Sequence, residues 1–251
     1  MVKGLDLFRN YFEGHTDKYI LIGGTACDIA MGRMDLEFRS TKDLDIVLII
    51  EALNAEFGNL LWTFIKEGEY QHRQKSTGKT ECYRFYKPGK EEFPYMLELF
   101  ARKPDAIALS PESHLTPIPL DEEASSLSAI LMDVDYYEFI LNGKTIAEDL
   151  PVIPETCLIP LKAKAFLELS ERKNSGESID SKDIKKHKND VFRLYQILTL
   201  DLNIELPQSI ANDMRLFLEK VLEDPPDLKT LGIRNATLTE VISNLSTIYN
   251  L

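Results

Sequence analysis

Two short stretches of the sequence decide the fold: Tyr19-Ile20-Leu21-Ile22-Gly23-Gly24-Thr25-Ala26 and, about fifteen residues later, Arg39-Ser40-Thr41-Lys42-Asp43-Leu44-Asp45-Ile46-Val47. The first predicts a strand that ends in two glycines and opens into a helix. Glycines leave backbone N–H groups unobstructed, and the positive end of the helix dipole lies there, so a phosphate is favoured at this point. Thr25 adds a hydroxyl donor or caps the helix. Such a glycine pair alone is more often only a tight turn.

The second stretch places two carboxylates at the start of an apolar strand. Residues two apart in a strand point to the same face, so Asp43 and Asp45 lie roughly 6–7 Å apart along the chain on one face. Two such charges repel each other unless water solvates them or cations neutralise them. Carboxylate oxygens suit magnesium, which also binds substrate phosphates. The alternative is that both acids are solvent-facing charges ahead of a buried strand.

A third carboxylate, Glu98, is the single charge in the strand candidate Tyr95-Met96-Leu97-Glu98-Leu99-Phe100. Alternation places Met96, Glu98 and Phe100 on one face of that strand. An acid between apolar neighbours is costly to bury without a partner. Two partners are open from the sequence: an arginine, with Arg84 on the preceding strand as the candidate, or the metal centre of the other two acids. The second is slightly favoured.

The two opening motifs together resemble a known family. Gly-Gly-x-Ala, followed by Arg-x-Thr-x-Asp-hydrophobic-Asp, is similar to the polymerase-β-like nucleotidyltransferase superfamily and, more narrowly, to the AbiEii/AbiGii-type toxin nucleotidyltransferases. The resemblance covers most of the chain but is specific from about residue 21 to residue 48. Its most specific part is the agreement of four positions at fixed spacing: Arg39, Thr41, Asp43 and Asp45.

The resemblance implies a function and the residues that perform it. It implies transfer of a nucleoside monophosphate from a nucleoside triphosphate to an acceptor hydroxyl, with about two magnesium ions bound. Asp43 and Asp45 would bind the metal, and Glu98 would be a third ligand or a general base. The positions expected to hold the triphosphate in the first half are Gly23, Gly24, Thr25, Arg39 and Thr41.

The resemblance also implies site residues in the second half of the chain. The family has a lysine-bearing helix and a later helix with an aspartate, and the candidates here are Lys162 or Lys164 and Asp190. The two lysines cannot share a helical face, so at most one enters a site, and Lys162 is preferred. The alternative for Asp190 is an exposed ion pair within its own helix. His187, on the apolar stripe of that helix, is expected to pack in the core.

Along the chain, the texture changes near residue 153. Before it, we predict helices over 5–13, 26–33 and 53–67 and strands over 19–22 and 44–50. We also predict a hairpin of 83–86 with 95–100 around Pro88-Gly89. A second hairpin is predicted from 136 to 152, with its turn at Asn142-Gly143. After it, the periodicity predicts helices over 158–172, 181–198, 208–222 and 238–249. We therefore expect an α+β fold: a nucleotidyltransferase domain over 1–153, built on a mixed sheet with helices, followed by a helical domain over 154–251.

Composition limits the partners and the location. The formal net charge of −12 disfavours long DNA as a ligand, because proteins that hold a nucleic-acid backbone usually carry a basic surface. We expect no membrane partner, since no apolar stretch approaches the length of a bilayer span. The N-terminal residues do not resemble a signal peptide, so a cytoplasmic protein is expected. Cys27, Cys82 and Cys157 show no metal spacing and are expected to be reduced and mostly buried.

The acceptor stays open at the level of the sequence. The family resemblance suggests tRNA or a protein, in the setting of a toxin paired with an antitoxin. A second enzyme class is a small-molecule nucleotidyltransferase of the aminoglycoside-modifying kind, in which an acidic cleft attracts a cationic acceptor. A third possibility, from another class, is a non-catalytic module that binds a partner protein.

Overall fold

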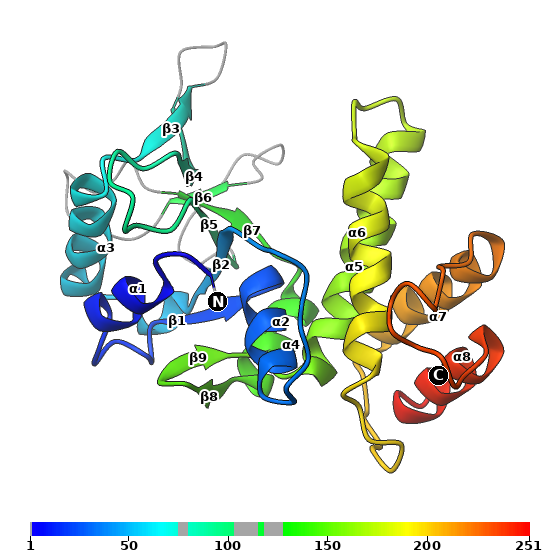
Figure 1. The fold of residues 1–251 in the computed structure, drawn as a ribbon. Coiled ribbons are helices and arrows are strands. Elements are labelled where there is room, and N and C mark those ends of the chain that lie inside the picture. The colour runs from blue at the N-terminus through cyan, green and yellow to red at the C-terminus, as the bar shows by residue number, and fades with distance from the viewer. Residues whose placement is uncertain (1, 75–79, 103–114, 118–127) are drawn as a thin grey trace. The chain divides into compact units, whose positions relative to one another are not determined.

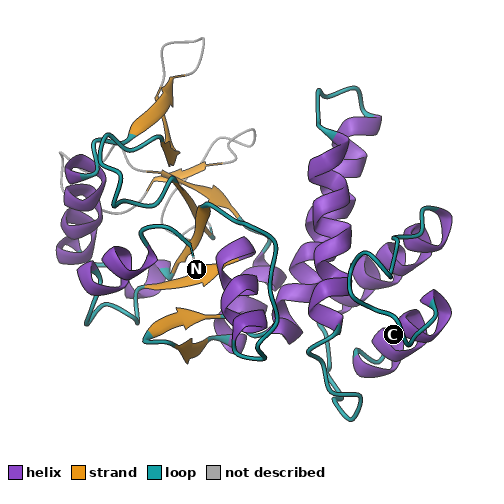
Figure 2. Cartoon of the chain, in the orientation of Figure 1, coloured by secondary structure: helices purple, strands orange, loops and turns teal. Residues whose placement is uncertain are grey.

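The computed structural model of the protein describes residues 2–74, 80–102, 115–117 and 128–251. Within these residues it is an α+β protein with one mixed sheet of nine strands and eight α-helices. The chain divides into two compact units. The first comprises residues 1–29 and 39–153, and the second comprises residues 30–38 and 154–251. All nine strands that the structure describes lie in the first unit. The strands are orange in Figure 2.

The sheet mixes parallel and antiparallel neighbours. Its main path runs in the order β3-β4-β5-β2-β1-β9-β8, and β7, which pairs with β6, also pairs with β5. The pair β2·β5 is parallel and lies near the centre, while β1 and β4 run antiparallel to their neighbours β2 and β5. The bounds are β1 Tyr19–Ile22, β2 Asp43–Leu48, β3 Gln71–Gln74, β4 Thr80–Tyr86, β5 Met96–Ala101, β6 Leu115–Pro117, β7 Ser128–Leu131, β8 Thr145–Ala147 and β9 Leu150–Val152.

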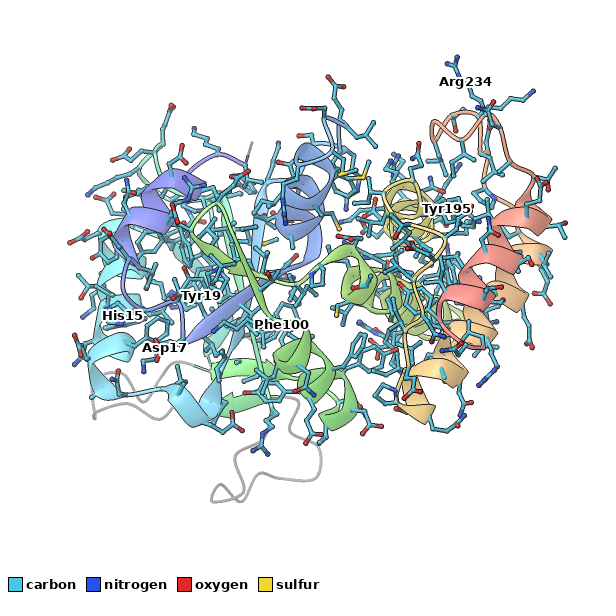
Figure 3. All side chains as sticks on the ribbon, turned by 90° about the horizontal axis from the view of Figure 1, so that it is seen from below. His15, Asp17, Tyr19, Phe100, Tyr195 and Arg234 are labelled. Atoms are coloured by element: carbon cyan, nitrogen blue, oxygen red, sulfur yellow. The ribbon has the colours of Figure 1, made fainter. Side chains whose placement is uncertain are left out.

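One face of this sheet is covered by α1 (Leu5–Tyr11) and α3 (Ala55–Glu67) (Figure 1). Alternate residues of β2 and β5 point into the resulting core: Leu44, Ile46, Leu97 and Leu99 are at most 1% exposed. Aromatic rings from both helices and β1 fill the space between the layers. Tyr19 and His15, labelled in Figure 3, both pack against Phe57 of α3. The residues that alternate with these buried leucine and isoleucine residues on β2 and β5 point to the opposite face of the sheet. They include Asp43, Asp45 and Glu98.

On that opposite face lie α2 (Gly23–Gly32) and α4 (Val134–Gly143) (Figure 1). The α4 helix contradicts the predicted second hairpin over 136–152. The side chain of Asp133 caps the helix by accepting a hydrogen bond from the backbone amide of Asp135 at 2.9 Å. The buried side of the helix has helical spacing and consists of Tyr136, Tyr137 and Ile140. Asn142 and Gly143, predicted as a turn, are its last two residues. The hairpin is the shorter β8–β9 pair, which turns at Glu148 and Asp149, both with positive φ.

The second unit contains four helices: α5 (Glu155–Asn174), α6 (Ser181–Tyr195), α7 (Gln208–Glu223) and α8 (Leu238–Ile248). Pro160 lies inside α5 and has no N–H to donate to the carbonyl of Thr156. The hydroxyl of Tyr249, which follows α8, donates to that carbonyl at 3.0 Å. The C-terminal end of the chain thus satisfies a backbone acceptor that the proline leaves open.

The sequence located most elements correctly. The strand over 19–22, the helices over 5–13 and 53–67, the first hairpin and the four C-terminal helices are confirmed within a few residues. The predicted helix over 26–33 begins earlier, at Gly23 itself. Cys27 and Cys157 are buried, as predicted, and neither forms a disulfide within the described residues. Burial raises the pKa of the Cys157 thiol to about 11. The side chain of Cys82 lies outside the described part of the structure.

Among the residues that the structure describes, none of the helices combines the length and the apolar character that crossing a bilayer requires.

Candidate functional site

The three predicted acids come from two neighbouring strands in parallel register. Asp45 of β2 is the Cα partner of Glu98 of β5, and Asp43 is the partner of Met96. Paired residues of neighbouring strands point to the same face, so the three carboxylates stand on the face that carries α2 and α4. All three are half-buried, whereas their strand neighbours Leu44, Leu97 and Leu99 are fully buried.

The glycine turn and the acidic motif fit against each other. A Cβ atom at Gly23 would lie 1.7 Å from Oδ2 of Asp45, and one at Gly24 would lie 2.3 Å from Oγ1 of Thr41. Gly23 also has a φ of +67°, a backbone conformation that side chains with a Cβ rarely adopt. The amide of Gly24 donates to Oδ2 of Asp45 over 3.4 Å. Only glycine lets the turn approach the Asp45 carboxylate this closely.

Thr25 links the same two segments from inside the fold. Its hydroxyl donates to the carbonyl oxygen of Asp43 at 2.8 Å, and the residue is 0% exposed. The sequence left two roles open for this hydroxyl, phosphate contact or helix cap, and Thr25 is the third residue of α2 rather than its cap. The bond instead fastens the first turn of α2 to the start of β2, which favours a positioning role. Arg39, at the start of the acidic motif, is half-buried.

Glu98 has the arginine partner that the sequence named as one of two alternatives. Nε of Arg84 forms an ion pair with Oε1 of Glu98, and the two residues are Cα partners on β4 and β5. The Glu98 side chain is 14% exposed and that of Arg84 is 40% exposed. Within the described residues, no three or more His, Cys, Asp or Glu side chains are arranged to hold a metal ion. The three acids share a face without forming a closed protein-only metal site.

The candidates in the second unit form a buried charge cluster. Nζ of Lys162 on α5 lies 3.4 Å from Oδ2 of Asp190 on α6, and Nη1 of Arg193 lies 3.0 Å from Oδ1 of the same carboxylate. Lys162 is 4% exposed and Asp190 is 0% exposed. The exposed ion pair proposed as the alternative for Asp190 is therefore wrong. The preferred lysine, Lys162, is the one that meets the aspartate.

Lys164 points elsewhere, as its spacing from Lys162 requires. Its Nζ lies 3.0 Å from Oδ2 of Asp213 on α7 and 3.9 Å from Oε1 of Glu168 one turn along α5. About a third of the side chain is exposed, so this is a surface ion pair that contributes little to stability. The two lysines, two residues apart, thus differ sharply in burial.

Sequence reasoning missed two members of these clusters. Arg193 follows Asp190 by three positions on the same helix, and this i,i+3 spacing of opposite charges was a usable signal. Asp213 carried no signal, because its contact with Lys164 depends on how α5 and α7 pack. His187, expected in the core, is half-buried rather than fully enclosed.

Comparisons with known proteins add no assignment to this geometry. No protein-family model matches the chain, and a search of curated proteins finds no match.

Proposed function

We propose that this chain is a magnesium-dependent nucleotidyltransferase with a polymerase-β-like catalytic unit. It moves a nucleoside monophosphate from a nucleoside triphosphate to the hydroxyl of an acceptor. The proposal is supported chiefly by one observation: the glycine turn at the start of α2 packs directly on the Asp45 carboxylate, with Gly23 in a conformation suited to glycine. A phosphate-binding turn and a metal-binding acid pair have to be this close, because the same phosphates contact both.

The acid pair suits magnesium even without a third protein ligand. Magnesium in nucleotide sites is usually bound through one or two carboxylates together with substrate phosphates and water. Asp43 and Asp45, both half-buried on one strand face, are such a pair. They would hold the cation, which would supply the positive charge that offsets the charge developing on the phosphates.

The remaining residues have roles that follow from their positions. The backbone amides of Gly23 and Gly24 lie at the positive end of α2 and would hold the triphosphate, and Thr41 lines the same turn. Glu98, beside Asp45, would act as a general base toward the acceptor hydroxyl or as a third ligand. For Arg39 and for Lys162, Lys164 and Asp190, contact with the nucleotide rests on the family resemblance alone.

The decisive test is Asp45→Asn, with Asp43→Asn as its companion. Asparagine keeps the size and the hydrogen-bonding shape but removes the charge that a divalent cation needs. We expect transfer of label from an α-labelled triphosphate to fall by at least about a thousandfold, while the unfolding free energy changes by less than about 1 kcal/mol. Asp149→Asn, an exposed acid of the β8–β9 turn whose left-handed conformation asparagine tolerates, is the matched control. Full activity in either site variant sinks the proposal.

The acceptor is tested with the same labelled triphosphates. Separate pools of tRNA, protein and aminoglycoside are incubated with the enzyme and magnesium, and the pool that takes up label identifies the acceptor class. We propose tRNA or protein, in a toxin that an antitoxin protein restrains. Label in the aminoglycoside pool alone would instead assign the small-molecule class.

A non-catalytic partner-binding module is the rival, and two contacts favour it. Glu98 is paired with Arg84, and the Gly24 amide is partnered by Asp45, so both groups already have partners within the chain. Calorimetry with magnesium and each of the four triphosphates separates the two functions. Binding of at least one triphosphate that is lost in Asp45→Asn supports the enzyme, and no binding of any supports the module.

A further inference from the structure

A row of residues in register crosses the sheet on the face of the acids. Arg84 of β4 pairs with Glu98 of β5, Glu98 pairs with Asp45 of β2, and Asp45 pairs with Ile22, which precedes the glycine turn on β1. Neighbouring strands are about 4.8 Å apart, so Arg84 stands about 10 Å across the sheet from the backbone of Asp45. Glu98 is thus placed between a cation on one side and an acid on the other.

The charges in this row explain why Glu98 needs a cation. Its carboxylate is only 14% exposed, and its lateral neighbour is another carboxylate. A half-buried acid beside a like charge is unfavourable unless a positive charge compensates it. Arg84 supplies that charge through Nε, while its side chain as a whole is 40% exposed.

We infer that Arg84 is a built-in counter-ion that occupies Glu98 in place of a divalent cation and competes with that cation for it. This inference rests on the proposed function, since it takes Asp43 and Asp45 as the primary cation ligands. In this arrangement the acid pair alone binds the cation weakly, and Glu98 joins as a ligand only when Arg84 releases it. Arg84 is a positioning residue: it acts through Glu98 rather than on substrate.

The sign of the effect follows from charge. Removing Arg84 frees a carboxylate beside the acid pair and takes one positive charge away from the cation site, and both changes strengthen cation binding. A unit charge at roughly 8–10 Å in a partly solvated site changes the affinity for a divalent ion about tenfold. A role confined to structure predicts the opposite, because loss of an outer partner that orients a ligand weakens metal binding.

The experiment measures binding of Mn²⁺ alone, followed by electron paramagnetic resonance, to the full chain. The variants are Arg84→Gln, Glu98→Gln, the double variant and Asp45→Asn. Arg102→Gln is the matched control: Arg102 also pairs with a glutamate, Glu51, and follows the end of β5 about 13 Å along the strand from Glu98. Melting temperatures in chelator and in excess Mg²⁺ are recorded for each variant.

We expect Arg84→Gln to bind Mn²⁺ about tenfold more tightly than the unmodified chain, and the gain to vanish when Glu98→Gln is added. Arg84→Gln should melt below the unmodified chain in chelator, and excess Mg²⁺ should close that gap. Arg102→Gln should leave the Mn²⁺ affinity unchanged. Binding by Arg84→Gln alone, with none by the unmodified chain, would support the inference in its strongest form.

Two results overturn the inference in different ways. Unchanged or weaker Mn²⁺ binding by Arg84→Gln, with binding by the unmodified chain that Asp45→Asn removes, rejects the competition while leaving the proposed function intact. Mn²⁺ binding that Asp45→Asn does not reduce, or no binding by the unmodified chain and Arg84→Gln alike, rejects the acid pair as the cation site and the competition with it.

Discussion

The sheet face that carries the acids in the first unit and the charge cluster of the second unit differ in how deeply they bury a carboxylate. On the sheet, Asp43, Asp45 and Glu98 remain half-buried, and one of them is paired with an arginine that is itself 40% exposed. Between α5 and α6, Asp190 is 0% exposed and lies between two cations, Lys162 and Arg193. The first arrangement keeps its carboxylates accessible to a ligand, and the second encloses its carboxylate completely.

The difference shows which charges can be exchanged. When one cationic partner of an enclosed aspartate is removed, the free energy of unfolding of the protein falls by several kcal/mol, because a buried charge is left without full compensation. At a partly exposed acid, one cation can be exchanged for another at small cost in free energy. Water and salt screen the carboxylate while neither cation is bound. By this criterion the first unit has the better-suited site for an exchangeable ion.

The largest effect should come from breaking the enclosed cluster. Lys162→Met removes one of two cationic partners of the buried Asp190, and we expect the free energy of unfolding to fall by about 3 kcal/mol. Lys164→Met, two residues away on the exposed ion pair with Asp213, should cost less than about 1 kcal/mol. Urea denaturation followed by circular dichroism measures both. Equal losses for the two variants would remove the contrast between the units.

The next effect concerns the glycine turn. Gly23→Ala puts a methyl group onto the Asp45 carboxylate at a φ of +67°, so we expect a loss of about 2–3 kcal/mol from strain and displacement of Asp45. Gly24→Ala meets Thr41, a side chain on a loop that can turn aside, and should cost about 1 kcal/mol or less. Chemical denaturation of both variants gives the order, and a stable, fully active Gly23→Ala would contradict the tight fit.

The smallest effect compares two buried phenols, one in each unit. Burial and the hydrogen bond to Glu51 raise the pKa of Tyr137, so its hydroxyl stays protonated; it donates to Glu51 at 2.8 Å and accepts the Ile50 amide at 3.1 Å. The hydroxyl of Tyr249 donates to the carbonyl oxygen of Thr156 at 3.0 Å. Removing these hydroxyls with Tyr137→Phe and Tyr249→Phe should cost about 2 and about 1 kcal/mol. Thermal unfolding of the two variants gives the comparison. A reversed order would show that the hydrogen bond to the Thr156 carbonyl contributes more to stability than those of Tyr137.

The helix over 134–143 shows where sequence prediction failed and why. Tyr136 to Leu141 combines aromatic and β-branched residues, and Asn142-Gly143 has the composition of a hairpin turn, so local preference favoured strands. The segment forms a helix because Asp133 caps its N-terminus and because one side of the helix, with Tyr136, Tyr137 and Ile140, is buried. Short apolar segments of this kind are decided by packing, which local preference does not contain.

The partner of Glu98 was undecidable from the sequence for a related reason. Alternation along 95–100 placed Met96, Glu98 and Phe100 on one face of the strand. The structure agrees, since these three residues are half-buried and the residues between them are buried. Choosing between Arg84 and a metal centre required the register of β4 on β5, and register depends on pairing across the sheet rather than on either strand alone.

The sequence by itself determined the local elements around the site: a strand that ends at Gly23-Gly24, a helix that follows, and an acid at alternate positions of β2, because these depend on backbone freedom and on a period of two along the chain. Tertiary structure alone decided that Gly23 meets Asp45, that Glu98 stands beside Asp45 and against Arg84, and that Lys162 rather than Lys164 is enclosed with Asp190. Each of these contacts joins segments distant in the chain. Their geometry is set by strand register and helix packing, which short-range sequence patterns do not encode.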